Sequence, residues 1–427
     1  MTETAIPDEA AETAAESRKA LIRLMIGLGI AAFLTVSFGV GATVLIVVAF
    51  LLMIMLHELG HYLTAKWAGM KVTEFFLGFG PRIWSVRRGE TEYGIKAIPA
   101  GGYVKIIGMH NLEVVDANDE PRTYRQQPFW RRLSVAVAGS TMHFIIAFVL
   151  LFVILAGVGL PVTTTTVGQI SAIRGGRSPA QEAGFRVGDR ILAVDGEPLE
   201  AWEDLPPYIR QHPGDELRFT VERDGEQIQL TAVPADLSKT EVEGMESPSE
   251  PTGFVGIGPK IANERVPPLT AVGESATTLG RLFGEVFRAL GSVFSFNGLQ
   301  TYGDVLLGRT GGTTAEDGGN NRFLSPVGFV RVAGQAAESG LADVLFLLVS
   351  INLFVGVFNM VPLLPLDGGH VVIAVYEKIR SMLAGRRYYA DVAKLMPLTY
   401  MVVLLLLFLG LTSLWLDITN PIDNPFQ

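Results

Sequence analysis

The feature that most constrains this chain is a set of four apolar segments that are each long enough to cross a lipid bilayer. A membrane-spanning helix needs about 20 predominantly apolar residues. The four segments are residues 25–56, 133–160, 344–366 and 395–416, and the first has 32 residues without a charge. The charged residues, 18% of the chain, fall mainly between them. The pattern predicts a polytopic α-helical membrane protein with sizeable aqueous parts.

The first segment predicts either one span or two. Gly39 and Gly41 lie near its middle, where a tight turn would divide it into a helical hairpin and bring the total from four spans to five. A hairpin would also place the basic residues before the segment on the same side as the basic loop after it, as the positive-inside rule expects. One long tilted helix is the alternative. The acidic start of the chain is not typical of a cleavable signal peptide and reads as a disordered tail.

Loop charge predicts which side of the membrane each loop occupies. Residues 66–132 carry 11 Lys or Arg against 7 Asp or Glu, residues 371–394 carry 5 against 2, and residues 161–340 carry 15 against 24. Because cytoplasmic loops are enriched in Lys and Arg, the first two loops are predicted to be cytoplasmic and the acidic segment external. The net charge of -9 lies mostly in that external segment, which argues against a nucleic-acid partner.

Metal-binding chemistry is indicated by the motif His57-Glu58-Leu59-Gly60-His61 at the end of the first apolar segment. On a helix, two histidines four residues apart project from one face and can bind one tetrahedral zinc ion. Glu58 is then placed to act as the general base toward zinc-bound water, as in HExxH sites generally. The alternative is a pair of interfacial histidines that bond to backbone or water.

A catalytic zinc site usually has three protein ligands, and Asp367 is the strongest candidate for the third. The chain contains no cysteine, which leaves histidine and carboxylate ligands. Asp367 follows an apolar segment interrupted by Pro362 and Pro365, and the charge rule places it at the same membrane depth as the histidine motif. A kinked helix with a capping aspartate is the alternative.

The external segment resembles a PDZ domain over residues 166–262. Residues 178–185 predict a short helix, and residues 187–194 predict a turn and a strand that ends in an Asp-Gly hairpin turn. A second Asp-Gly turn at residues 224–225 separates two further predicted strands. The resemblance implies an α+β domain that accepts a peptide or a chain terminus at a sheet edge. A role that only excludes large substrates is equally compatible.

Together these patterns closely resemble the site-2 protease family of intramembrane zinc metalloproteases, and in particular its bacterial, PDZ-containing branch that cleaves anti-sigma factors. The matching motifs are HExxH at 57–61, Gly-Phe-Gly-Pro at 78–81, Gly-Gly-Tyr-Val at 101–104 and NxxPxxxLDGG at 359–369. The resemblance implies that a Zn2+ cofactor is held by the two motif histidines and Asp367, that Glu58 is the general base, and that Asn359 helps to position the substrate.

The resemblance also implies that residues 93–106 form a membrane-dipping β-hairpin, which pairs with the substrate as a strand. One position departs from the family pattern. Family members commonly have a GPxxN run where this chain has Gly139-Ser140-Thr141-Met142-His143. His143 is therefore either a packing residue of an apolar helix or a substrate-positioning residue that bonds the scissile carbonyl or the oxyanion.

The function that these features predict is an intramembrane zinc metalloendopeptidase of the bacterial plasma membrane. By resemblance, its substrates are transmembrane segments of single-span proteins such as anti-sigma factors already trimmed outside the membrane. The active site is expected near the cytoplasmic side and the PDZ-like domain outside. The alternative is a catalytically silent, membrane-tethered PDZ scaffold, against which the complete motif set argues. A metal transporter would require polar residues along several spans and repeated halves, and neither is present in the sequence.

The predicted organisation of the chain divides it into nine segments. These are an acidic tail (1–20), the N-terminal span or spans with HExxH (21–68), a cytoplasmic loop with the hairpin (69–132), a transmembrane helix (133–160), the PDZ-like domain (166–262), an external amphipathic linker (263–340), a transmembrane helix with NxxPxxxLDGG (341–370), a cytoplasmic loop (371–394) and a last transmembrane helix (395–416).

Overall fold

The structure is a computed structural model that describes residues 41–109, 113–173, 176–239, 248–309 and 324–421. The chain divides into two compact units. We call Leu155–Pro267 the inserted unit, and we call Met1–Ile154 with Pro268–Gln427 the helical unit. Each is described by itself.

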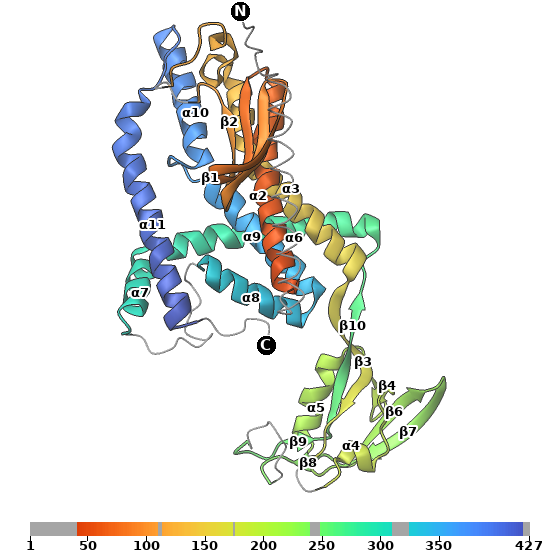
Figure 1. Ribbon diagram of the computed structural model, residues 1–427. Helices are drawn as coiled ribbons and strands as arrows, with labels where there is room; N and C mark the ends of the chain where they lie inside the picture. Colours follow the sequence, from red (N-terminus) through yellow and green to blue (C-terminus); the bar gives the residue numbers. More distant parts are fainter. Residues whose placement is uncertain (1–40, 110–112, 174–175, 240–247, 310–323, 422–427) are drawn as a thin grey trace, which may run out of the picture. The chain divides into compact units, whose positions relative to one another are not determined.

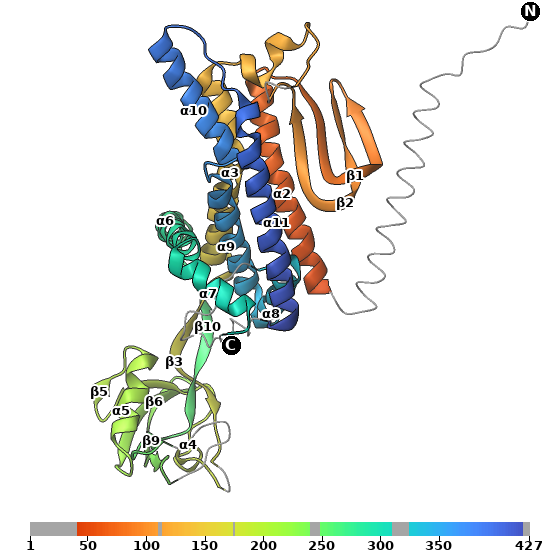
Figure 2. The ribbon, with the colours of Figure 1, turned by 90° about the vertical axis from the view of Figure 1, so that its left-hand side faces the viewer.

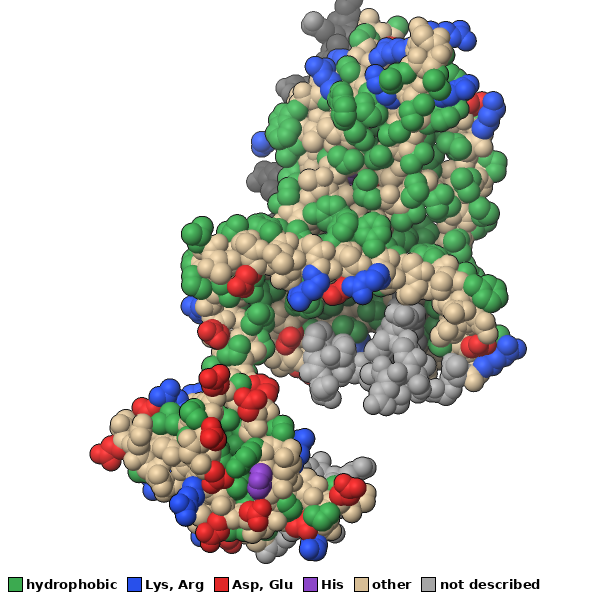
Figure 3. All heavy atoms as spheres, turned by 180° about the vertical axis from the view of Figure 1, so that it is seen from behind, with side chains coloured by type: hydrophobic (Ala, Val, Ile, Leu, Met, Phe, Trp, Pro, Cys, Tyr) green, Lys and Arg blue, Asp and Glu red, His purple; other side chains and the backbone are tan. Residues whose placement is uncertain are grey.

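Four helices of the helical unit are long and apolar enough to cross a membrane. They are α2 (Gly41–Trp67), α3 (Phe129–Phe152), α9 (Leu341–Asn359) and α11 (Met396–Thr419). Each of the four predicted apolar segments therefore contains one of these helices within the described residues. The choice between one and two N-terminal helices depends on residues before Gly41, which lie outside the described residues. Hydrophobic side chains cover much of this unit, and Lys and Arg gather at one end of it (Figure 3).

Helix α3 lies at the centre of the helical unit, where it packs against α2, α9, α10 (Asp367–Ala384) and α6 (Pro268–Val293) (Figure 1). It continues into a π-helical turn, Val153–Val158. Ala147, Leu151, Val349 and Leu353 form a buried contact between α3 and α9. Leu279, Leu282 and Val286 on the apolar side of α6 pack against the same cluster. This helix lies within the linker 263–340, which was predicted to be amphipathic.

Two strands, β1 (Val72–Arg88) and β2 (Thr91–Ile106), form a sheet beside α2 (Figure 2). Both strands fold back on themselves, because Phe75 pairs with Val104 and also with Tyr93. The predicted hairpin within 93–106 is corrected accordingly: β2 pairs with β1, which the sequence did not identify as a strand. Gly78 and Gly80 have φ angles of 88° and 84°, so they interrupt the alternating pattern that marks a strand.

The NxxPxxxLDGG segment differs from the single predicted helix over 341–370. Helix α9 ends at Asn359, residues 360–366 form turns, and α10 begins at Asp367. Pro362 and Pro365 lack the N–H groups that a continuous helix would need there. The loop predicted over 371–394 is also wrong in its first half, because α10 continues to Ala384. Its apolar residues recur at helical spacing between charged ones, and that pattern was read as a loop.

Shorter elements complete the helical unit. They are the 3-10 turns η1 (Glu120–Arg122), η2 (Tyr124–Gln126) and η6 (Val392–Leu395), and the helices α7 (Phe296–Leu306) and α8 (Pro326–Ser339). Helix α8 packs against α2, α9 and α11. Most of the Gly/Thr-rich segment between α7 and α8 lies outside the described residues.

The inserted unit contains a six-stranded sheet of order β10-β3-β4-β6-β7, in which β5 pairs with β4. The strands are β3 (Leu160–Ile170), β4 (Arg190–Val194), β5 (Glu197–Pro198), β6 (Leu217–Arg223), β7 (Glu226–Ala232) and β10 (Ile257–Glu264). Helices α4 (Pro179–Glu182) and α5 (Leu205–Gln211) and a short pair, β8 (Ala235–Asp236) with β9 (Gly253–Phe254), accompany it.

Both Asp-Gly turns predicted for the inserted unit are confirmed. Asp195 joins β4 to β5 with φ 49°, and Asp224 joins β6 to β7 with φ 54°, the left-handed conformation that tight hairpin turns require. The unit has its own core, which includes the fully buried Ile191, Phe219 and Val221. Its first and last strands pair with each other, and the Val266 N–H donates to the Leu155 carbonyl at 2.9 Å.

Candidate metal centre

The two motif histidines lie on one face of α2, as their spacing predicts. His57 and His61 are both buried, and their Nε2 atoms are 3.2 Å apart. The Nδ1 atom of His61 lies 2.7 Å from the carbonyl oxygen of Val135 on α3. Since a carbonyl only accepts hydrogen bonds, Nδ1 carries the proton and Nε2 keeps its lone pair for a ligand.

Asp367 reaches the same point from the beginning of α10. Its Oδ2 atom is 3.5 Å from His57 Nε2 and 3.3 Å from His61 Nε2. The two glycines that follow it permit this approach. A Cβ atom at Gly368 would overlap the backbone of Met360, and one at Gly369 would lie 2.7 Å from the Leu364 nitrogen. The LDGG sequence therefore lets the start of α10 fold tightly against the loop before it.

The three side chains fit zinc. They form a group of potential metal ligands, and their ligand atoms are 3.2–3.5 Å apart. Ligands around a tetrahedral zinc ion at bonds of about 2.0–2.1 Å are separated by about 3.3–3.5 Å. Asp367 Oδ2 is buried and has no hydrogen-bond partner in the described part of the chain. A buried carboxylate oxygen without a donor is costly unless a cation binds it.

Gly139 on α3 closes one side of the metal centre. A Cβ atom at this position would overlap the imidazole rings of both His57 and His61. On α2, which faces Gly139, a Cβ atom at Gly60 would lie 2.7 Å from the Ala138 carbonyl oxygen. The two glycines therefore allow α2 and α3 to approach each other closely at the histidine motif.

Glu58 lies on the other side of the motif, against β2. Its Cγ atom would be 3.0 Å from a Cβ atom built on Gly102, so only a glycine leaves room for the Glu58 side chain there. Glu58 is half-buried. Its carboxylate is therefore held between α2 and β2. In the sequence, Glu58 directly follows His57 and lies three residues before His61.

His143 lies beside the metal centre but is not a member of its ligand group. It is 1% exposed, its ring centroid is 4.9 Å from that of His57, and its Nδ1 is 2.9 Å from Asn352 Oδ1 on α9. Asn352 Nδ2 donates to the Leu348 carbonyl at 2.7 Å. This bond directs the Asn352 oxygen to His143, so His143 Nδ1 is the donor and Nε2 is left for another partner.

Asn359 is the last residue of α9, and among the described residues its side chain makes no hydrogen bond. The sequence reading missed Asn352, although a polar residue within an apolar span is itself a signal of function. It also missed Gly139, whose importance depends on a contact between two helices that the sequence does not specify.

A cavity of about 750 Å³ opens next to the metal centre within the helical unit. One wall is the end of β2, at Val104 and Ile106, and the opposite wall is Leu364 and Pro365, just before Asp367. The remaining lining residues are Lys105, Met109, Glu113, His370, Val392, Met396 and Thr399. The cavity is large enough for several side chains of an extended peptide.

Most of the chain is similar in sequence to proteins of a known family. The model of peptidase family M50 matches residues 45–409. The zinc metalloprotease Rip1 of Mycobacterium bovis is 33% identical over 412 residues, which cover 89% of this chain and 97% of that protein. Rip1 of Mycolicibacterium smegmatis is 33% identical over 419 residues, which cover 90% and 99%. A solved PDZ domain of an SdrC-like protein from Listeria monocytogenes covers 22% of this chain and 90% of its own, with 18% identity and a TM-score of 0.17.

Proposed function

Since the chain belongs to peptidase family M50, the site-2 protease family of zinc metalloproteases, we propose that it hydrolyses peptide bonds at a zinc ion held by His57, His61 and Asp367. The observation that carries this assignment is the convergence of their three ligand atoms to within 3.5 Å of one another. Two of them come from one helix, and the third comes from a residue about 300 positions further along the chain.

Glu58 acts as the general base and then as the general acid. When bound, zinc supplies Lewis-acid chemistry, which polarises a peptide carbonyl and lowers the pKa of water toward about 7. The Glu58 carboxylate takes a proton from the attacking water and delivers it to the leaving amine nitrogen. Its place between α2 and Gly102 holds it on the β2 side of the site. His143, fixed by Asn352, positions the scissile peptide from the α3 side, and Asn359 assists from the end of α9.

The substrate is an unwound transmembrane segment of a single-span protein. A transmembrane helix buries its peptide groups in internal hydrogen bonds, so a segment must unwind before water can attack it. The end of β2 borders the cavity beside the metal centre, where an extended segment can add as a further strand. On the strength of the family resemblance, we propose that trimmed anti-sigma factors are substrates of this kind.

The end of the helical unit rich in Lys and Arg faces the cytoplasm. The loops 66–132 and 371–394 both carry an excess of basic residues, which the positive-inside rule associates with the cytoplasmic side. The metal centre, at the end of α2 and the beginning of α10, then lies near that side. Most of the inserted unit belongs to the acidic segment 161–340, and it lies on the external side of the membrane.

The inserted unit docks an extended peptide or a chain terminus. A cavity of about 370 Å³ lies between α5 and the segment 253–257 and is lined by Trp202, Leu205, Ile209 and Phe254. These residues make it mostly apolar, which suits a side chain anchored beside a sheet edge. A role in excluding large ectodomains remains the competing assignment.

The test of the proposed function combines zinc content with cleavage. The purified protein in detergent should contain about one zinc per chain and cut a trimmed single-span anti-sigma-type substrate. Glu58→Gln should keep the zinc and lose activity by roughly 100-fold or more, since general acid-base catalysis contributes about 10²–10⁴. His57→Ala should lose both zinc and activity. His143→Leu should keep zinc and lower kcat. Exposed Glu338→Gln on α8 is the control.

Three results would overturn the assignment. Cleavage that persists in Glu58→Gln, or after a chelator has removed the metal, would show that the motif does not carry the reaction. A protein that binds no zinc would favour the membrane-tethered scaffold instead.

A further inference from the structure

A second cavity of the helical unit, of about 270 Å³, lies at the beginning of α3. We call it the α3 cavity. Four of the side chains that line it are cationic, and only one is anionic. The cations are Arg125, Arg132, Lys378 and Arg387, and the anion is Glu377. The cavity is separate from the set of residues that line the cavity at the metal centre.

Two of the four cations have their charge neutralised locally. Arg132 is paired with the buried Glu377, and Arg125 is paired with Glu120. Lys378 and Arg387 form no ion pair with any residue that the structure describes. The α3 cavity therefore carries two uncompensated positive charges.

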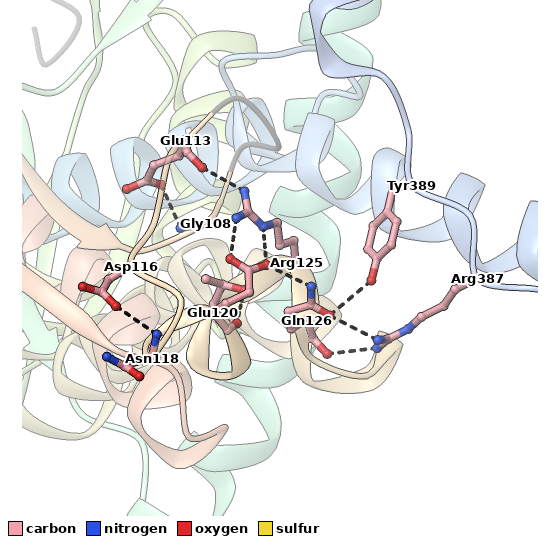
Figure 4. A network of polar contacts seen from close by, with 10 residues as sticks. Gly108, Glu113, Asp116, Asn118, Glu120, Arg125, Gln126, Arg387 and Tyr389 are labelled. Carbon is pink, nitrogen blue, oxygen red and sulfur yellow. Dashed lines mark hydrogen bonds and ion pairs between the residues drawn. The ribbon is translucent and has the colours of Figure 1, made fainter.

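The Arg387 guanidinium is held in place by neutral partners. Its Nη2 donates to the Gln126 carbonyl at 2.9 Å, and its Nη1 lies 3.3 Å from Gln126 Oε1, while the Gln126 amide is anchored on Glu120 (Figure 4). A guanidinium has five N–H donors. Two are used here, so Arg387 is oriented and still has donors for an anion.

The first turn of α3 adds backbone donors to the same cavity. The helix has 24 residues and begins after Pro128, with no side-chain cap. Among the described residues, no acceptor is found for the N–H groups of Phe129 and Trp130. Arg132 is 9% exposed, and its Nε is buried without a hydrogen-bond partner in the same described residues. The start of a long helix favours negative charge.

The α3 cavity also lies at the depth of lipid headgroups. The candidate span of α3 begins at Phe129. Phe129, Tyr388 and Tyr389 line the cavity, and the ring of Trp130 contacts that of Phe129. Aromatic side chains of this kind are enriched at the membrane interface. Basic pockets between transmembrane helices at such a position bind anionic headgroups.

We propose that the α3 cavity binds the phosphate of an anionic phospholipid headgroup, with Lys378, Arg387 and the first N–H groups of α3 as donors. This site goes beyond the proposed proteolysis and does not depend on it. A bound lipid would link the first turn of α3 to the second half of α10. Further along α3 lie Gly139 and His143, and α10 starts at Asp367. It would thus stabilise two of the helices around the metal centre.

The test measures lipid binding rather than cleavage. The full chain, delipidated in detergent, is titrated with phosphatidylglycerol or phosphatidylcholine and followed by native mass spectrometry. Phosphatidylglycerol should bind at least tenfold more tightly. Lys378→Gln breaks no described contact and should weaken this binding by about fivefold, and Lys378→Gln with Arg387→Gln by roughly 25-fold, at about 1 kcal/mol per cation. Arg87→Gln with Arg88→Gln, which removes the same charge from exposed positions of β1, should have little effect.

Three results would overturn the proposal. The first is equal affinity for the two lipids. The second is unchanged phosphatidylglycerol binding in the Lys378 and Arg387 double variant while its zinc content and thermal midpoint match the wild type. The third is displacement of phosphatidylglycerol by inorganic phosphate at equal concentration, which would identify a site for soluble anions. An equal loss in the Arg87 and Arg88 control would show that binding follows net charge alone.

Discussion

The absence of a side chain at Gly139 determines how closely α3 can approach the histidine motif. A methyl group there would overlap both imidazole rings. The contact is made by rings that must keep their orientation to bind a metal, because the Nδ1 of His61 is fixed on the carbonyl of Val135. Overpacking at this point therefore acts on the metal centre directly.

We expect Gly139→Ala to lower zinc occupancy and to destabilise the protein by about 1–3 kcal/mol, the usual cost of an added methyl group in a packed core. Zinc content and the thermal midpoint in detergent would measure the two effects. Gly280→Ala on α6, where a Cβ meets nothing within 4 Å, is the matched control; it should leave zinc occupancy unchanged and raise stability by up to about 1 kcal/mol, because Ala favours a helix over Gly. Full zinc occupancy in Gly139→Ala would contradict the close packing described here.

At the scale of single residues, the sequence predicted the local part of the site. The spacing of His57 and His61 places both on one helical face whatever surrounds the helix. The side chain of Asp367 was predicted from its motif and its membrane depth. The pairing of His143 with Asn352 could not be predicted, because these residues lie 209 positions apart and no pattern specifies how α3 and α9 are rotated against each other.

Glu90 links the end of α2 to the segment after β2, and its charge makes that link sensitive to pH. Hydrogen bonds from Arg122 and Lys66 lower the pKa of Glu90 from 4.5 to about 2. A carboxyl group whose pKa is lower in the folded state stabilises that state above the unfolded pKa, and this contribution disappears as the pH falls toward the folded pKa.

We therefore expect wild type to be more stable than Glu90→Gln at pH 5–7, and the difference in thermal midpoint to vanish between about pH 4.5 and 2. Acid also protonates the metal ligands, but it does so in both proteins. The difference between their thermal midpoints therefore reports the contribution of Glu90. A constant gap down to pH 2 would argue against the ion pairs of Glu90.

At the scale of elements, a buried ion pair joins α3 to α10. Arg132 is paired with Glu377, whose other carboxylate oxygen accepts the Ala390 N–H at 2.7 Å. The Tyr124 hydroxyl donates to the Arg132 carbonyl at 3.2 Å. The pair therefore links α3, which packs on the histidine motif, to the helix that presents Asp367.

Glu377→Ala should destabilise the protein by about 3–5 kcal/mol, because it leaves the Arg132 guanidinium buried without a counter-charge. Replacing both residues by methionine should recover much of this loss, since a buried ion pair is often no more stable than an apolar pair. Thermal or denaturant unfolding in detergent would test both. Glu92→Ala, which removes the partner of the exposed Arg82, should cost less than about 1 kcal/mol.

Elements were predicted well where burial in lipid sets the composition. A run of about 20 apolar residues has few alternatives to a transmembrane helix, and each of the four runs contains such a helix in its described part. Residues 72–88 and 371–384 were not predicted as β1 and α10. In residues 72–88 the alternating pattern is interrupted at Gly78 and Gly80, so the structure of β1 depends on tertiary contacts. In residues 371–384 the apolar residues recur at helical spacing, a signal for α10 that the prediction of a loop did not use.

At the scale of the whole molecule, the inserted unit has a core that involves no residue of the helical unit. The core residues all lie between Val167 and Val255. The two Asp-Gly turns and the pairing of β3 with β10 also lie within the unit. A stable fold that does not depend on the membrane follows from this arrangement.

We expect residues 155–267, expressed alone, to give a soluble protein with a dispersed amide NMR spectrum and a single cooperative thermal transition. Phe219→Ala, at a fully buried position, should lower its stability by about 3–5 kcal/mol. Val187→Ala, at an exposed position, should have little effect. A collapsed spectrum for the wild-type fragment would mean that the unit needs the rest of the chain.

The chain enters and leaves the inserted unit at neighbouring points, since the Leu155 carbonyl and the Val266 N–H are hydrogen-bonded. A short turn between α3 and α6 could therefore replace the whole unit without changing the course of either helix. In evolutionary terms the unit is an inserted domain that can be replaced as a whole. Descendants of one protease could exchange, duplicate or lose it while the metal centre of the helical unit is inherited unaltered.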